Sequence, residues 1–288
     1  MSILFTTNTL RYKLVILLIA QLFFGSYSNA QYQGTYHTGE FGIQAGAAHY
    51  FGDLNTISAL NRPGVAFGAF FRKQLNNYTA LRFAVNHAKL SYSDNLQSKN
   101  EFQRRRNLDF SSRIWEVLIL GDFNFFRFNP SNPDERFTPF LTFGLGLFSF
   151  NPYTFLEGEK QFLRPLGTEG QNSSAFPDKK AYPTSAICLP IGFGVKWSLN
   201  SRVNMHFEIT HRFTTTDYLD DVSGSYAGKE AFLSGTAAAL LQDRSYETGE
   251  PIGKAGFQRG FNGNKDQYIV ANLGITFNFS SYRCPGAN

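Results

Sequence analysis

Hydrophobic and polar residues alternate with a period of two along most of the chain after residue 38. The clearest segment is RVNMHFEITHRFT, residues 202–214. Its large apolar residues fall on one face of an extended chain: Val203, Met205, Phe207, Ile209 and Phe213. Its polar residues fall on the other: Arg202, Asn204, His206, Glu208, Thr210 and Arg212. A helix would scatter both sets around its circumference, so the pattern predicts a β-strand.

Eight segments of this kind are predicted as strands, at 39–51, 64–75, 79–92, 112–126, 137–148, 185–197, 202–214 and 269–279. Short connections at 74–78, 129–136 and 198–202 alternate with long ones at 52–63, 93–111, 151–183 and 217–266. An even number of strands with this alternation predicts an all-β fold, an eight-stranded antiparallel up-and-down transmembrane β-barrel of the outer-membrane type. The long loops 151–183 and 217–266 are then external, and the short turns and both termini are periplasmic.

The charged residues lie on the less apolar face of the strands, which favours a polar lumen and an apolar surface towards lipid. A soluble barrel with a greasy cavity would have the opposite arrangement. We predict a polar network in the lumen that is formed by six residues: Arg202, His206, Glu208, Arg212, Glu116 and Lys196. Eight strands leave room only for side chains, so the protein is not expected to be a porin.

The N-terminus resembles a cleaved signal peptide. Arg11 and Lys13 precede the apolar run 14–25, and Ala30 offers a small-residue cleavage position. We predict a signal peptide at 1–30, a barrel at 31–288 and a location in the outer membrane, with membrane lipid as one partner. Without Arg11 and Lys13 the net charge falls from +5 to +3, with 25 basic and 22 acidic residues, which is too balanced to indicate a nucleic-acid partner.

Candidate chemistry is sparse. The five histidines lack the spacing of a zinc motif, so no metal and no cofactor are expected. His211 is predicted to face outward near the external rim, where some barrel enzymes hold a Ser–His–acid triad, but no serine and carboxylate are committed to the same patch. We therefore expect no enzyme, no catalytic residue and no small-molecule substrate. A lipid-modifying enzyme stays open as an alternative.

The acidic and aromatic residues at the external rim and the two cysteines allow further predictions. Asp217, Asp220 and Asp221 are expected to cap the barrel mouth and bond to Arg212 or to backbone amides, while an ion at these acids stays open. Tyr218 and Tyr226 would suit an aromatic girdle at the membrane interface. A disulfide between Cys188 and Cys284 is not expected, because the two fall on non-neighbouring parts of the barrel.

Five motifs in order carry a resemblance to a known family: YFGDLN (50–55), ALRF (80–83), PFLTFGLGLFSFNP (139–152), LPIGFGVKW (189–197) and TDYLDDVSGSY (216–226). Together they resemble the PorG-like outer-membrane β-barrels of Bacteroidota, components of the type IX secretion system. The likeness extends over about residues 39–284.

The resemblance implies a non-enzymatic barrel subunit of the type IX protein secretion and gliding machinery. Such a subunit would link periplasmic ring proteins of the PorK/PorN (GldK/GldN) type to the outer membrane. The tail residues Tyr282, Arg283 and Cys284 are the hypothesised partner contact, since Tyr and Arg are favoured interface anchors. The alternative is a free-standing surface barrel that binds ligands or adheres through its external loops.

Overall fold

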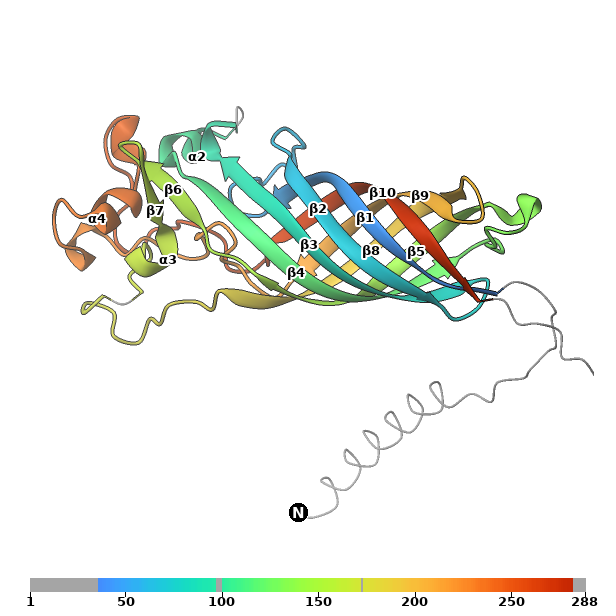
Figure 1. The fold of residues 1–288 in the computed structure, drawn as a ribbon. Coiled ribbons are helices and arrows are strands. Elements are labelled where there is room, and N and C mark those ends of the chain that lie inside the picture. Colours follow the sequence, from blue (N-terminus) through green and yellow to red (C-terminus); the bar gives the residue numbers. More distant parts are fainter. Residues whose placement is uncertain (1–35, 97–99, 172, 282–288) are drawn as a thin grey trace, which may run out of the picture. The chain divides into compact units, whose positions relative to one another are not determined.

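The structure is a computed structural model that describes residues 36–96, 100–171 and 173–281. The predicted signal peptide at 1–30 lies outside these ranges. Eight long antiparallel strands form the barrel: β1 (Tyr36–Phe51), β2 (Gly64–Gln74), β3 (Thr79–Ser93), β4 (Asp109–Asn124), β5 (Phe137–Ser149), β8 (Ser185–Ser198), β9 (Val203–Thr214) and β10 (Gln267–Ser281) (Figure 1). Each pairs with the next along the chain, and β10 pairs with β1. The predicted eight-stranded barrel is confirmed.

The barrel is closed, and its two faces have opposite character. Large apolar side chains point outward and are exposed, among them Phe143 at 60% and Leu147 at 64%. Charged side chains point inward and are buried, with Arg72 and Arg82 at 0%. A hydrocarbon environment offers the outward residues favourable contact, and closure leaves no strand edge with unpaired amides. The fold is therefore of the outer-membrane type.

The inward face of β4 differs from the simple alternation of the other strands. Ile114, Leu118 and Leu120 are buried there together with Glu116 and Asp122. Because apolar residues occupy both faces of this strand, its sequence does not reveal which face is the interior.

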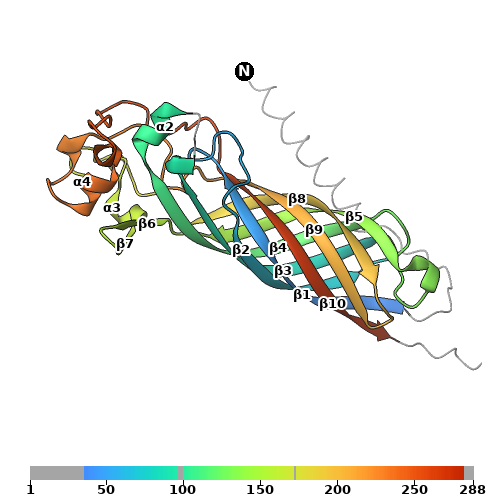
Figure 2. The same ribbon diagram turned by 90° about the horizontal axis from the view of Figure 1, so that it is seen from above.

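The strands end in short turns at one end of the barrel, which we call the turn face: residues 75–78, 125–136 and 199–202. The turn 125–136 contains the short helix η2 (Pro133–Glu135). At the other end, the four long connections 52–63, 94–108, 150–184 and 215–266 fold together into a structure that we call the cap (Figure 2).

The cap contains elements that the sequence pattern did not predict: η1 (Asp94–Leu96), α2 (Glu101–Arg106), β6 (Tyr153–Leu156), β7 (Glu159–Phe162), α3 (Leu163–Leu166), η3 (Lys229–Ala231), α4 (Ala237–Leu241) and η4 (Ser245–Glu247). The hairpin β6–β7 turns at Glu157 and Gly158, both with positive φ. It joins the barrel sheet through the pair Ser111–Tyr153. No helix among the described residues is long and apolar enough to cross a membrane.

Candidate functional site

The part of the lumen nearer the turn face holds a group of buried ion pairs. Arg72 contacts the carboxylate of Glu40, and its Nε lies 2.6 Å from Asp122 Oδ2. The contact with Asp122 is an ion pair by distance, although its angles do not make a hydrogen bond. Lys196 lies 3.6 Å from the same carboxylate and donates to Asn124 Oδ1 at 3.0 Å. Asp122 thus pairs with both Arg72 and Lys196, and Arg82 is its third cation.

A second arginine extends this group across the barrel. Arg82 on β3 donates to Glu208 on β9 at 2.7 Å and lies 3.2 Å from Asp122 Oδ1. The guanidinium groups of Arg72 and Arg82 both lie over the ring of Phe70, at 4.8 and 5.3 Å. We call the six charged residues the lumen core: Glu40, Arg72, Arg82, Asp122, Lys196 and Glu208.

The charges of the lumen core balance, because three cations face three carboxylates. All six are at most 2% exposed. Burying an unpaired charge is costly, whereas a paired and hydrogen-bonded one is tolerated. The group therefore fills this level of the barrel with charge that is neutralised from within.

A second cluster lies nearer the cap and is centred on Glu116. Its carboxylate accepts from Arg212 at 2.9 Å, from the Tyr268 hydroxyl at 2.8 Å and from Asn86 Nδ2 at 2.8 Å. The Nε2 of His206 lies 3.3 Å from Gln44 Oε1, and Gln44 donates to Asn86 of this cluster at 3.0 Å. The structure thus places His206, Glu208, Arg212, Glu116 and Lys196 in the lumen.

The prediction that Arg202 belongs to the lumen network is wrong, because its side chain is exposed on the turn face. The side chain of Asn200 accepts from the backbone N–H groups of Arg202 and Val203, so the turn continues through Arg202 and the strand begins one residue later. A local side-chain bond of this kind competes with strand pairing.

Two carboxylates of the lumen core, Glu40 and Asp122, were not predicted from the sequence. Each has a signal in the sequence, since Glu40 shares the inward parity of Gln44 on β1 and Asp122 that of Glu116 on β4. Asp122 was obscured by the apolar residues between it and Glu116. Arg72 and Arg82 stand on the charged face that the alternation predicts.

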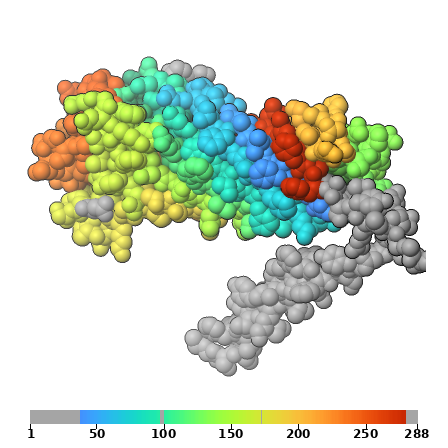
Figure 3. Space-filling view, in the orientation of Figure 1, coloured from blue at the N-terminus to red at the C-terminus, as the bar shows by residue number. Residues whose placement is uncertain are grey.

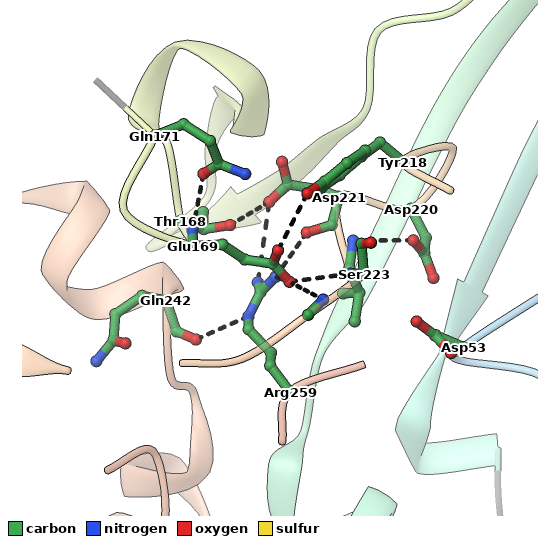
Figure 4. Close-up of polar contacts among 12 residues, drawn as sticks. Asp53, Thr168, Glu169, Gln171, Tyr218, Asp220, Asp221, Ser223, Gln242 and Arg259 are labelled. Atoms are coloured by element: carbon green, nitrogen blue, oxygen red, sulfur yellow. Dashed lines mark hydrogen bonds and ion pairs between the residues drawn. The ribbon is translucent and has the colours of Figure 1, made fainter. Parts of the chain in front are cut away.

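The cap is held together by a second set of buried charges, with Arg259 at its centre (Figure 4). Arg259 lies 3.2 Å from Glu169 Oε1 and 3.8 Å from Asp221 Oδ2, and it donates to the backbone oxygens of Asp221 and Gln242 at 2.6 and 3.1 Å. Glu169 also accepts from the backbone N–H of Ser223 at 2.9 Å. One guanidinium thereby connects residues of the two longest loops.

The two shorter loops join the same structure. Arg106 forms a bidentate pair with Asp94, with both distances 2.7 Å, and donates to the backbone oxygen of Arg259. Asp53 accepts from the backbone N–H of Phe261 at 2.9 Å. All four connections are thus fixed to one another by charge-assisted bonds, which are stronger than neutral ones.

Asp217, Asp220 and Asp221 form only some of the bonds that the sequence predicts. None bonds to Arg212, which pairs with Glu116 instead. Asp217 accepts from the Ser223 hydroxyl at 2.6 Å, and Asp220 accepts from the backbone N–H of Val222 at 2.9 Å. Asp221 pairs with Arg259 and accepts from the Tyr182 hydroxyl at 2.6 Å.

The interpretation of Tyr218 and Tyr226 as girdle residues is wrong. Tyr226 is 1% exposed inside the cap, and Tyr218 stacks on Tyr182 with ring centroids 4.4 Å apart. Both follow a segment that folds inward over the barrel mouth, so their rings pack in the cap.

Three carboxyl groups, those of Asp53, Asp220 and Asp266, lie near Tyr50 under the cap. The Tyr50 hydroxyl lies 2.5 Å from Asp220 Oδ2 and 3.1 Å from Asp266 Oδ1. Since a phenol carries one hydrogen, the two carboxyl groups compete for it, and a protonated carboxyl could donate to the phenol oxygen in its turn. Burial raises the pKa of Asp220 well above its usual range, and the neighbouring Asp266 and Asp53 add to the effect.

The pKa values of Asp266 and Asp53 are raised as well. Burial and then Asp217 raise the pKa of Asp266 well above its ordinary value. Burial raises the pKa of Asp53 to about 6, opposed by the bond from Phe261 N–H and by Arg106. Within residues 36–96, 100–171 and 173–281, no group of three or more His, Cys, Asp or Glu side chains is arranged to hold a metal ion.

The remaining expectations concern single residues. The Nε2 of His211 lies 2.6 Å from Gln267 Oε1, and its ring packs at 49° against the ring of Phe213 on the outward face, with centroids 4.5 Å apart. Cys188 is a buried free thiol. Cys284, with Tyr282 and Arg283, lies outside the described residues, so the hypothesised tail contact stays a prediction.

Comparison with known proteins gives one family match. The sequence profile described as "Domain of unknown function (DUF6089)" matches residues 13–243. No curated protein matches the chain.

Several solved structures of membrane barrels are similar in fold. Neisserial surface protein A is 12% identical, with 86% of this chain and 100% of that chain covered and a TM-score of 0.41. The N-terminal barrel domain of OprF from Pseudomonas aeruginosa is 10% identical, with 85% and 100% covered and a TM-score of 0.36. Ail of Yersinia pestis, in complex with the heparin analogue sucrose octasulfate, is 11% identical, with 84% and 99% covered and a TM-score of 0.39.

Proposed function

This chain belongs to the DUF6089 family, described as a domain of unknown function, and we propose that it is a non-enzymatic outer-membrane barrel subunit of the type IX secretion and gliding machinery. In this role the barrel is a membrane anchor. It links periplasmic ring proteins of the PorK/PorN (GldK/GldN) type to the outer membrane.

The observation that carries the proposal is the lumen core. Arg72, Arg82 and Glu208 are buried and paired across the full width of the barrel. A barrel filled in this way has no room for a solute path, which favours a supporting role over transport. The PorG-like motifs at 50–55, 139–152 and 216–226 connect that role to type IX secretion.

The sidedness of the barrel adds a constraint on the contact. With the cap outside the cell, a periplasmic partner reaches only the turn face and the segments that precede β1 and follow β10. These are small epitopes, so several copies would have to engage a symmetric ring for stable binding.

The experiment is purification of the tagged barrel from native membranes in mild detergent, with quantification of co-purified ring lipoprotein. We expect the ring lipoprotein to be recovered with the wild-type barrel, and recovery to fall for the Tyr282→Ala/Arg283→Ala variant. Heat-modifiability on gels serves as the folding control. Recovery of the folded barrel without any ring component would contradict the proposal, whereas unchanged recovery with the variant would reject only the tail as the contact.

A second function is favoured by a different observation. The cap is a preformed structure held by Arg259 and Arg106, and it exposes large apolar residues: Leu233 at 80%, Phe257 at 60% and Phe261 at 54%. Rigid loops with exposed aromatic residues suit binding at the cell surface, because little ordering is required on association. A barrel lacking residues 229–257 that keeps normal secretion but loses surface adhesion would favour this second function.

A further inference from the structure

The turn face carries a depression of about 660 Å³ beside the turn that connects β4 and β5. This turn forms the green lobe at the right of Figure 3. Five aromatic residues line the depression: Tyr78, Phe125, Phe126, Phe137 and Trp197. Its volume is within the range of roughly 300–1,000 Å³ that is usual for small-molecule sites.

The depression adjoins the apolar surface of the barrel. Phe137 on β5 and Trp197 on β8 are paired in register, and both side chains point outward. Phe137 is 45% exposed and Trp197 is 61% exposed. Their rings meet edge to face at 6.2 Å. Aromatic residues at the end of an apolar band mark the level of the lipid headgroups, so the depression opens at that level.

Pro133 and four charged residues complete the lining, and two of the charged residues neutralise each other. Arg127 Nε lies 3.4 Å from Glu135 Oε1. Arg136 and Asp134 have no ion-pair partner among the residues that the structure describes, and the Nε of Arg136 is buried without a hydrogen bond. The Arg136 side chain as a whole is half-buried, and its positive charge lines the depression without an ion-pair partner among the described residues, which favours an anionic ligand.

The charge of the lining limits the identity of that partner. Two cations and two carboxylates sum to zero, so an excess of negative charge on the ligand would not be compensated. One free guanidinium and one free carboxylate, Arg136 and Asp134, instead complement a ligand that carries both a phosphate and an ammonium. A guanidinium binds phosphate through a fork of N–H donors, and a carboxylate accepts from a primary ammonium.

We propose that this depression binds the phosphoethanolamine headgroup of a membrane phospholipid. Arg136 holds the phosphate, Asp134 accepts from the primary ammonium, and the acyl chains run along Phe137 and Trp197. The contact fixes the depth of the barrel in the leaflet on the turn side.

The test is lipid retention by the purified barrel, measured by native mass spectrometry after equilibration with equal amounts of phosphatidylethanolamine, phosphatidylcholine and phosphatidylglycerol of identical chains. We expect phosphatidylethanolamine to be retained preferentially. Arg136→Gln should reduce this retention about tenfold, which is what loss of a charge-assisted hydrogen bond is worth. Asp134→Asn should remove the preference over phosphatidylcholine, whose quaternary ammonium donates no hydrogen bond.

Arg202→Gln is the matched control, because Arg202 is an exposed arginine of the same turn face that does not line the depression. Heat-modifiability confirms that each variant is folded. Equal retention of the three lipids, preference for phosphatidylglycerol, or an equal loss with Arg202→Gln would overturn the proposal.

Discussion

Arg82 on β3 donates to Glu208 on β9 across the lumen at 2.7 Å, although the two strands are not neighbours in the sheet. Both side chains are at most 2% exposed. The bond therefore spans the interior of the barrel and connects opposite walls. It belongs to a group of balanced charges that fills the lumen where a channel would otherwise run.

Glu208→Ala should destabilise the barrel strongly, because it leaves the buried guanidinium of Arg82 without this partner. Breaking a buried pair from one side typically costs about 3–5 kcal/mol. We expect a lower urea midpoint and a smaller heat-modifiable fraction on gels. Arg202→Ala, at an exposed site on the turn face, should leave both unchanged. An unaltered midpoint for Glu208→Ala would show that the lumen is hydrated.

Arg259→Met should loosen the cap while the barrel stays folded, because Glu169 and Asp221 lose their shared cation. Limited proteolysis should cut within 215–266 faster by about tenfold or more, as expected when a buried charge pair is broken. Lys254→Met is the control, since Lys254 is an exposed cation of the same loop. Equal cleavage of the two variants would contradict the central role of Arg259.

The cap should lose stability as pH rises. The pKa of Asp53 is raised from its ordinary 3.8 to about 6, and those of Asp220 and Asp266 are raised well above the same ordinary value, in each case mainly by burial. The folded cap thus binds more protons than the unfolded chain, so its stabilisation is complete below the ordinary pKa and is lost as pH rises through the folded values.

Hydrogen exchange of the cap segments, corrected for intrinsic rates, measures this directly. Exchange should accelerate as pH rises through about 6, the folded pKa of Asp53, because protonation of the folded cap is lost there. Asp220→Asn keeps the shape of the side chain without its charge and should weaken the dependence. Slower exchange at the higher pH would show that these carboxyl groups are ionised in the folded cap.

An epitope tag inserted at 233–235 in the cap should be accessible on intact cells, because this segment is exposed and lies at the end of the long connections. A tag at 199–201 in the β8–β9 turn should be labelled only after permeabilisation. The reverse pattern would invert the orientation of the barrel and place the cap in the periplasm.

The sequence predicts the barrel well because lipid and lumen impose opposite demands on alternate residues. On β9 the alternation identifies every inward side chain from Asn204 to Arg212. It fails at Arg202, where the side chain of Asn200 extends the turn. It is uninformative on β4, where Leu118 and Leu120 are interior residues although they are apolar.

The cap could not be predicted in the same way. Its elements are short, and bonds between residues far apart in the chain hold them, as in the pair of Arg259 with Glu169. Hairpin β6–β7 has only four residues in each strand, but its Glu157–Gly158 turn is a recognisable signal. The position of Tyr226 inside the cap depends on this long-range folding and has no local signature.

We propose that the barrel is a membrane anchor whose lumen is filled by side chains. The ionic conductance of the purified, folded protein in a planar lipid bilayer tests this most directly. Because the lumen core occupies the interior with paired, buried side chains, insertion should produce no resolvable conductance steps. Reproducible steps from the wild-type protein would show an open path through the lumen and contradict the account.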